Sequence, residues 1–238
     1  MPTPIDIAFD VRTDAGGKDP DSHSATLRSF HRQLWSKALP GGNVLDLDSH
    51  LSHSSSLGEF QLASDAIAHT YSAWKRPTAL VEVREQVPRE DIASFRDLAC
   101  TVGAYMVFPR RKHADGKWQL SINQARGMHP RIADRFDLTL ECIRRQYLGI
   151  DNPLARTLRW YEDFFALFDD FHGYVRFFLL DDLVAEDCSS VRFLIDFDGF
   201  ERTPLPSASA DEYRGYIERS MAFIRARNER IDACSGLQ

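Results

Sequence analysis

The sequence predicts an α+β fold, in which a small, mostly antiparallel or mixed sheet packs against helices contributed mainly by the C-terminal half. Short segments of alternating apolar and polar residues lie in the first half, helical spacing of apolar residues dominates the second half, and no internal repeat is present. The chain has 238 residues, 43% of them hydrophobic, which is enough for a stable core. We expect one domain over residues 1–238, with residues 1–23 largely irregular because turn-forming residues are dense there.

Capping residues and apolar periodicity set the expected elements of the first half. Ser24 is placed to cap the first helix, and Pro88 is placed to open a later one. Asp115-Gly116 is a turn signal between two strands. The expected elements are, in order, a helix at 24–37, a strand at 43–49, a serine-rich surface loop at 49–60, a helix at 62–74, a strand at 78–85, a helix at 88–103, and strands at 104–111 and 117–124.

The second half is expected to be mainly helical. Phe136, Leu140, Ile143 and Tyr147 recur with helical spacing and define one apolar face. The aromatic-rich stretch that follows is typical of core helices. The expected elements are helices at 136–147, 153–168 and 173–184, a strand at 190–197, and a final amphipathic helix at 210–231.

Composition and charge exclude several classes of protein. The net charge of −6 disfavours a chain whose whole surface binds nucleic acid, although clustered arginines leave room for a local basic cleft. No apolar run reaches the length of a membrane span, so we expect no membrane segment. The four cysteines are widely spaced and no secretory leader precedes them, which favours reduced thiols and a cytoplasmic location.

The main candidate site begins where an expected strand ends. Asn123, Gln124 and Arg126 are three polar residues that close an apolar segment, and Gly127 would let a bound group approach the backbone. A guanidinium fork suits phosphate or carboxylate, and amide side chains can recognise an amide or a base edge. We therefore predict ligand binding by these residues. The alternative is that Arg126 pairs with Asp134 across the turn.

Charged residues in the next turn and helix extend this candidate site. Arg131 and Arg135 would favour an anionic ligand if they face the same space. Asp137 and Glu141 lie one turn apart on the expected polar face, where they could act as a catalytic base or as metal ligands. The alternative is a solvated ladder of ion pairs with Arg144 and Arg145.

Other patterns carry less weight. His50 and His53 are three residues apart, but no third ligand stands at a zinc-binding spacing, so no metal site is predicted. A histidine followed by a short strand and a serine also suggests an ADP-ribosyltransferase-like pocket, without a glutamate that can be placed. No nucleophile-elbow, Walker, dinucleotide-binding or kinase motif is present, and no cofactor is indicated.

Several motifs resemble those of an uncharacterised bacterial family, a domain of unknown function. These motifs are WSKALPGG, LGEF, INQARG, RFDLTLECIRRQYLG and GYVRFFLLDDLV. The resemblance covers about residues 9–231 and implies one compact domain. The family has no established activity, so the resemblance assigns no functional residue.

The sequence favours an enzyme or ligand-binding protein for a phosphate-bearing or nucleotide-like molecule. It does not decide whether the chain is an enzyme. One alternative is a non-catalytic interaction or regulatory module, as in a defence or toxin cassette, with another protein as its partner. A further alternative is an ADP-ribosyltransferase-like or nucleic-acid-acting protein.

Overall fold

An antiparallel sheet of three strands is the only sheet in the part of the chain that the computed structural model describes, namely residues 4–55, 58–68, 78–113, 115–201 and 209–235. Its strands are β1 (Ser52–Ser55), β2 (Gly58–Ala66) and β3 (Tyr105–Arg110), in the order β1-β2-β3. The predicted α+β class, with a small antiparallel sheet, is confirmed.

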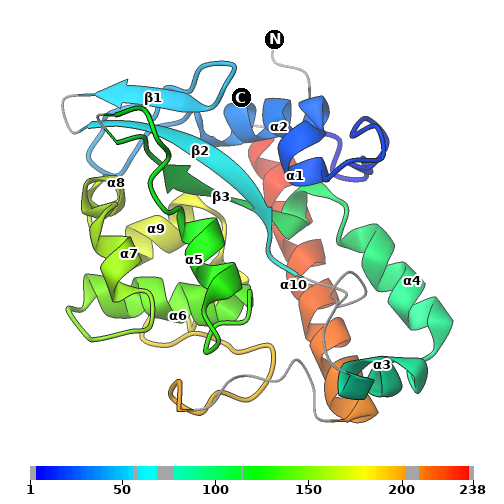
Figure 1. Ribbon diagram of the computed structural model, residues 1–238. Coiled ribbons are helices and arrows are strands. Elements are labelled where there is room, and N and C mark those ends of the chain that lie inside the picture. Colours follow the sequence, from blue (N-terminus) through cyan, green and yellow to red (C-terminus); the bar gives the residue numbers. More distant parts are fainter. Residues whose placement is uncertain (1–3, 56–57, 69–77, 114, 202–208, 236–238) are drawn as a thin grey trace.

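Helices surround this sheet. Figure 1 shows α5 to α9 grouped below the sheet, whereas α3, α4 and the long α10 stand beside its other end. The helices are α1 (Pro20–His23), α2 (Ala25–Trp35), α3 (Thr78–Glu85), α4 (Arg89–Leu98), α5 (Ile122–Met128), α6 (Phe136–Tyr147), α7 (Ala155–Arg159), α8 (Glu162–Ala166), α9 (Phe171–Phe177) and α10 (Ala210–Ser235), with 3-10 turns η1 (Val102–Ala104) and η2 (Asp181–Leu183).

The register of the sheet leaves part of the central strand with one open edge. β1 pairs only with the first part of β2, up to Ser52 opposite Gln61. β3 pairs with the later part, from Gln61 opposite Arg110 to Ala66 opposite Tyr105. Beyond Leu62, whose amide still bonds to the Leu51 carbonyl, no strand of the described residues lies beside the far edge of β2. Side chains from helices reach that edge instead.

Local capping signals were reliable guides to the helices. The Ser24 hydroxyl accepts a hydrogen bond from the Leu27 amide at 3.0 Å and starts α2, as predicted. Pro88 precedes α4, again as predicted, although that helix ends at Leu98 instead of reaching Gly103. The predictions of helices at 136–147 and 210–231 are confirmed by α6 and α10.

In two segments the predicted type of element is wrong, since a strand replaces the start of an expected helix and a helix replaces an expected strand. The helix expected from residue 62 is wrong at its start, because residues up to Ala66 belong to β2; residues 69–74 lie outside the described chain. Pairing with β3 outweighs the capping signal at Ser64 and Asp65. The strand expected at 78–85 is helix α3, which packs against α10 despite its β-branched residues.

Three further expected strands do not form as such. Residues 43–49 and 190–197 contribute only isolated bridges, Ala38 to Val44 and Val184 to Val191. The loop expected at 49–60 instead contains β1 and the start of β2. In the segment 117–124 only the bridge from Lys112 to Trp118 remains, and its last residues start α5. The aromatic stretch after residue 153 forms several short helices instead of two long ones.

The buried hydrophobic side chains form one cluster that joins both halves of the chain. Helix α10 is tied to it by Arg227, which is fully buried and donates to the carbonyls of Gly103, Tyr105 and Phe178. Burial lowers the pKa of Arg227 to about 9, while the nearby Tyr174 opposes that shift. All four cysteines are free thiols. In the described part of the chain no helix is both long and apolar enough to cross a membrane.

Candidate functional site: a polar pocket at the open edge of the sheet

Asn123 and Gln124 lie in the first turn of α5, so their expected position at the end of a strand is wrong. Ser121 caps this helix, and Ser121 and Gln124 form a capping box in which each side chain bonds the other's backbone amide. The Asn123 amide group donates to the Ser64 carbonyl at 3.1 Å. Its Oδ1 is buried and has no hydrogen-bond partner among the described residues. Asn123 therefore holds the open edge of β2, whereas Gln124 caps a helix.

Arg126 lies at the centre of a buried ionic network. The side chain has 0% exposure, and its Nη1 lies 2.5 Å from an Asp65 oxygen and 2.6 Å from Asp134 Oδ1. It also donates to Thr139 Oγ1 and to the Asp134 carbonyl. Burial alone would lower the pKa of Arg126, but Asp65 and Asp134 outweigh that effect and raise it. A ligand could reach this guanidinium only by displacing an internal partner.

The acids of α6 are buried, so the expectation of a solvated polar face is wrong for them. Asp137 has 0% exposure, pairs with Arg135 and accepts a hydrogen bond from the Leu194 amide at 2.8 Å. Glu141 has 3% exposure and pairs with Arg144 and Arg145, each at 2.8 Å. Glu141 thus forms the predicted ion pairs with Arg144 and Arg145, but its carboxylate is buried and does not face solvent.

The predicted site residues therefore do not form one site, because they belong to separate ion-pair networks or to the surface. Arg126 is in one ionic network, Arg135 and Asp137 form a second, and Glu141 a third. Arg131 is exposed, and its backbone amide donates a hydrogen bond to His129 Nδ1. The ligand-binding and catalytic roles assigned to these residues stay predictions. Asn123 and Arg126 both bond to β2, Asn123 to the Ser64 carbonyl and Arg126 to the Asp65 carboxylate.

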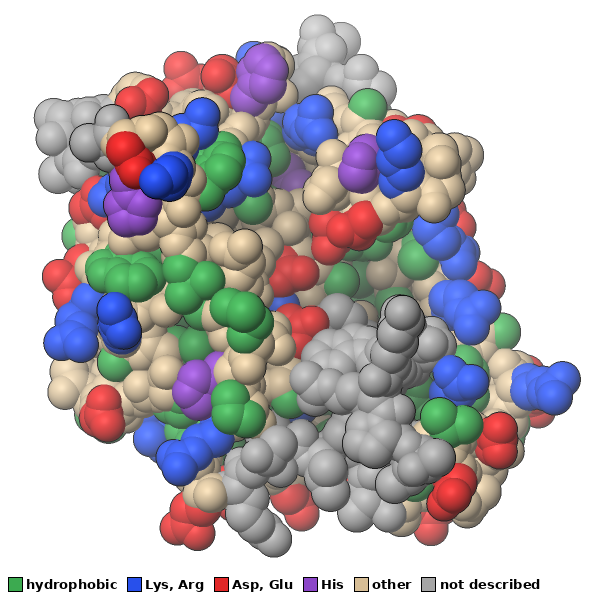
Figure 2. Space-filling view, viewed as in Figure 1, with side chains coloured by type: hydrophobic (Ala, Val, Ile, Leu, Met, Phe, Trp, Pro, Cys, Tyr) green, Lys and Arg blue, Asp and Glu red, His purple; other side chains and the backbone are tan. Residues whose placement is uncertain are grey.

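A polar pocket adjoins β2 at Ser64. We call it the hairpin pocket, because it lies beside the β1–β2 hairpin, where β2, the turn before β1, the end of β3 and the helices α1 and α2 line it. Its volume is about 280 Å³. Figure 2 shows a hollow on this face of the molecule, with acidic, basic and histidine side chains around it. The lining residues are Asp21, Ser22, Arg28, His31, His50, Leu51, Gln61, Leu62, Ala63, Ser64 and Arg110.

Two arginines of the hairpin pocket have no acidic partner. Arg28 donates to the Ser22 carbonyl at 3.0 Å, and Arg110 donates to Gln61 Oε1 at 2.6 and 2.9 Å. No carboxylate among the described residues pairs with either guanidinium, and the undescribed stretches contain no Asp or Glu. Burial and the positive charge of Arg28 lower the pKa of Arg110. Two like charges that face one pocket without a counterion favour an anion there.

Asp21 is the acid that lines the same pocket, and its charge is suppressed. Burial, together with the negative charges of Asp65 and Asp19, raises the pKa of Asp21 to about 8. Its Oδ1 is buried and has no hydrogen-bond partner among the described residues. At neutral pH the carboxyl group is mostly protonated, so it adds little negative charge to the pocket and can donate a hydrogen bond into it.

His31 and Ser64 form the floor of the pocket, and their hydrogen bonds fix the tautomer of the histidine. The Trp35 indole N–H, which can only donate, reaches His31 Nδ1 at 3.1 Å. The proton of the neutral ring is therefore on Nε2, which donates to Ser64 Oγ at 3.0 Å. Complete burial lowers the pKa of His31 to about 3. At neutral pH His31 cannot take the Ser64 proton, so the serine hydroxyl is a hydrogen-bond donor and not an activated nucleophile.

A second, outer pocket of about 570 Å³ adjoins the first. The two share His50, Gln61 and Arg110 in their linings. The Arg110 guanidinium lies 4.2 Å from the centre of the Trp118 ring, which is 48% exposed. A ligand that extends out of the hairpin pocket would therefore meet an exposed aromatic surface.

The histidines singled out in the sequence have different positions. His50 lines both pockets. His53 is buried in β1, bonds through Nδ1 to the Asp46 carbonyl at 2.9 Å, and packs on Phe60. Within the described residues, no three His, Cys, Asp or Glu side chains form a group that could hold a metal ion.

Sequence reasoning did not find Arg28, Gln61, Ser64 and Arg110 as members of one site. They belong to three separate elements, α2, β2 and β3, that meet only through strand pairing and helix packing. One available signal was the alternation in β2, where Phe60 and Leu62 are buried and Ser64 follows on the same face. A polar residue that continues an apolar strand face marks the point where the core gives way to the pocket.

Fold and pocket together describe an α+β protein with a polar, partly basic surface pocket at a sheet edge. The chain belongs to DUF6994, a family of unknown function, which it matches over residues 5–231. The resemblance drawn from the motifs is thereby confirmed. No curated protein and no solved structure matches the chain significantly.

Proposed function

We propose that this protein binds a small phosphate-bearing molecule in the hairpin pocket, either as a ligand-binding protein or as an enzyme acting on it. The observation that carries the proposal is the pair of guanidinium groups, Arg28 and Arg110, that line one pocket without a carboxylate partner. Arginine forks bind phosphate oxygens through paired, charge-assisted hydrogen bonds.

Neutral donors complete the proposed binding site. The Ser64 hydroxyl is free to donate because it accepts its hydrogen bond from His31. The protonated Asp21 carboxyl is a second donor at neutral pH. A pocket of about 280 Å³ holds a phosphate group with a small organic portion, and a nucleotide-like ligand would extend into the outer pocket toward Trp118.

If the protein is an enzyme, Asp21 is the group we expect to transfer a proton. Its raised pKa of about 8 suits a general acid near neutral pH, and it lines the pocket that would hold the phosphate. Nucleophilic catalysis by Ser64 is disfavoured by the tautomer of His31. The catalytic roles predicted for Asp137 and Glu141 would require their buried ion pairs to open.

Calorimetric titration with inorganic phosphate, pyrophosphate, a sugar phosphate and a nucleoside diphosphate tests the proposal. At least one of these should bind, and Arg110→Gln should weaken that binding about tenfold or more, which corresponds to about 1.4 kcal/mol. Arg28→Gln should weaken it as well.

Arg159→Gln is the matched control, because Arg159 is exposed on α7 and no hydrogen bond or ion pair holds it in the described structure. This variant should bind like the unmodified protein. Equal affinity of the Arg110 and Arg159 variants, or no binding by any member of the panel, would refute the proposal.

A further inference from the structure

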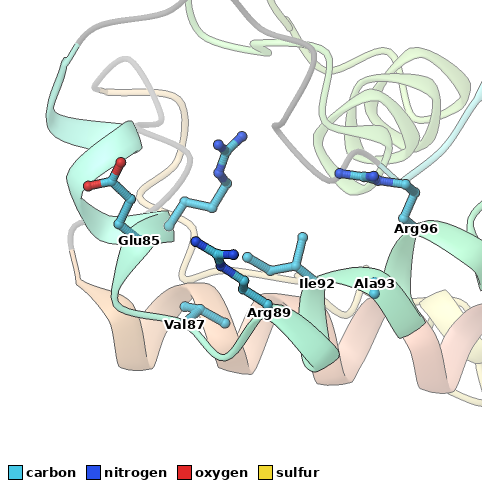
Figure 3. A pocket seen from close by; sticks show the side chains of 7 residues that line it. Glu85, Val87, Arg89, Ile92, Ala93 and Arg96 are labelled. Carbon is cyan, nitrogen blue, oxygen red and sulfur yellow. The ribbon is translucent and has the colours of Figure 1, made fainter.

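A second basic hollow, distinct from the hairpin pocket, lies between α3 and α4. It has a volume of about 610 Å³. We call it the helical groove, and Figure 3 shows its lining side chains. These are Arg84, Glu85, Val87, Arg89, Ile92, Ala93 and Arg96.

One face of α4 forms most of this groove. Arg89, Ile92, Ala93 and Arg96 follow the spacing i, i+3, i+4 and i+7, so they share one side of the helix. In Figure 3, Arg96 extends back over this face from the far end, and the Glu85 carboxylate points away from Arg89 and Arg96. A small apolar strip is therefore bordered by a guanidinium at each end.

The three arginines of the helical groove lack acidic partners. No hydrogen bond or ion pair holds the guanidinium of Arg84, Arg89 or Arg96 in the described structure, and every Asp and Glu of the chain lies within the described residues. Burial raises the pKa of the nearby Tyr213, and the charges of Arg84 and Arg96 act against that rise. Both arginines are thus close enough to one tyrosine for their charges to act on it.

The spacing of these charges selects the size of the ligand. Arg89 and Arg96 are seven residues apart on a helix that rises about 1.5 Å per residue, so their origins are separated by about 10 Å. One phosphate ion is too small to bridge them. Two acidic side chains seven positions apart on a helix, or about three apart on an extended segment, have the matching separation.

A peptide fits this groove better than a nucleic acid does. The apolar strip at Ile92 and Ala93 offers a contact for an apolar side chain, which a phosphate backbone would not use. The same two helices carry Glu82, Glu85, Glu90 and Asp91, and the chain has a net charge of −6. These negative charges would repel a continuous polyanion, whereas a peptide can place its acids only at the arginines.

We propose that the helical groove is a docking site for an acidic peptide segment of another protein, with carboxylates on the arginines and an apolar side chain over Ile92. This proposal is independent of the phosphate site. It corresponds to the interaction module that the sequence left open as an alternative.

An array of fluorescent 15-residue peptides tests this proposal by anisotropy. Each peptide carries two glutamates at helical spacing seven or extended spacing three, with varied apolar residues between them. Matched peptides have lysine in place of glutamate, and a labelled 15-base-pair DNA is the nucleic-acid probe. At least one acidic peptide should bind the full chain, and raising the salt from 0.1 to 0.5 M should weaken binding several-fold.

The triple variant Arg84→Gln, Arg89→Gln, Arg96→Gln should weaken peptide binding at least tenfold without changing phosphate binding at the hairpin pocket. Its control is the triple variant Arg156→Gln, Arg159→Gln, Arg225→Gln, which removes three exposed arginines elsewhere and should bind the peptide within twofold of the unmodified chain. Three results would overturn the proposal. They are binding of no acidic peptide, equal binding by the two triple variants, and tighter binding of the DNA than of any peptide.

Discussion

Arg126 and Arg110 are held in opposite ways, although both contact the central strand of the sheet. Arg126 has 0% exposure and two carboxylates within 2.6 Å, whereas Arg110 is half-buried and, among the described residues, its guanidinium hydrogen-bonds only to the amide oxygen of Gln61. A buried charge is tolerated only when its partners are complete. Arg126 therefore stabilises the fold, whereas the guanidinium of Arg110 retains donors that can bind a ligand.

A third arrangement shows that partner type matters as much as burial. Arg227 is as buried as Arg126, yet carbonyl oxygens and not carboxylates receive its hydrogen bonds. The pKa of Arg227 is lowered, whereas that of Arg126 is raised. The sequence motif that contains an arginine therefore does not show whether the arginine is structural or available to a ligand. The groups that its guanidinium contacts in the folded chain do show this.

The largest effect should come from breaking the network of Arg126. Arg126→Gln removes a fully buried guanidinium that pairs with the partly buried carboxylates of Asp65 and Asp134, and it should lower the free energy of unfolding by about 3 to 5 kcal/mol. Urea denaturation measures this, with Arg159→Gln expected within about 0.5 kcal/mol of the unmodified chain. A variant of Arg126 that is as stable as this control would remove the distinction between the two arginines.

A smaller, pH-dependent effect should appear at Asp21. The pKa of Asp21 is raised from 3.8 to about 8, so between these values the folded chain binds a proton that the unfolded chain has released. The stability contributed by the neutral carboxyl is complete at low pH and is lost as the pH rises through about 8.

Asp21→Asn keeps the neutral form at every pH. The stability of the variant relative to the unmodified chain should increase by about 1 to 3 kcal/mol between pH 5 and pH 9, because only the unmodified chain continues to lose stability over this range. Urea denaturation at both pH values decides this. A constant difference between the two proteins would mean that the pocket does not suppress the charge of Asp21.

The smallest effect should come from the outer side of the α6 ladder. Arg145 pairs with Glu141, but Arg144 pairs with the same carboxylate and remains in Arg145→Gln. We expect a loss of about 0.5 kcal/mol, as for other pairs at this helical spacing. A loss above 2 kcal/mol in thermal or urea unfolding would show that each arginine is indispensable to the buried acid.

The sequence predicts those features that depend on nearby residues. Ser24 and Pro88 start their helices as expected, because a cap needs only the next turn of the chain. The type of β2 was missed, because its stability as a strand comes from β3, which lies far away in the sequence. The 78–85 segment was missed for a related reason, since packing of α3 against α10 overrides its strand propensity.

The same limit applies to the candidate site. The cluster around Arg126 is visible in one short segment, and the alternative that the sequence offered, a pair between Arg126 and Asp134, is present. That Asp65 completes this pair could not be predicted without placing β2 beside α5. Arg28 and Arg110 carry no shared motif, so only the folded chain brings them to one pocket.

Site-resolved NMR of the arginine Nε–H groups tests the central distinction most directly. Signals of Arg28, Arg110, Arg126 and Arg227 can be assigned from single Arg→Gln variants or, where a variant fails to fold, from through-bond spectra. On titration with pyrophosphate, the signals of Arg28 and Arg110 should shift together with one dissociation constant, while those of Arg126 and Arg227 stay in place. Shifts confined to Arg126, or no shift at Arg28 and Arg110, would contradict the assignment of anion binding to the hairpin pocket.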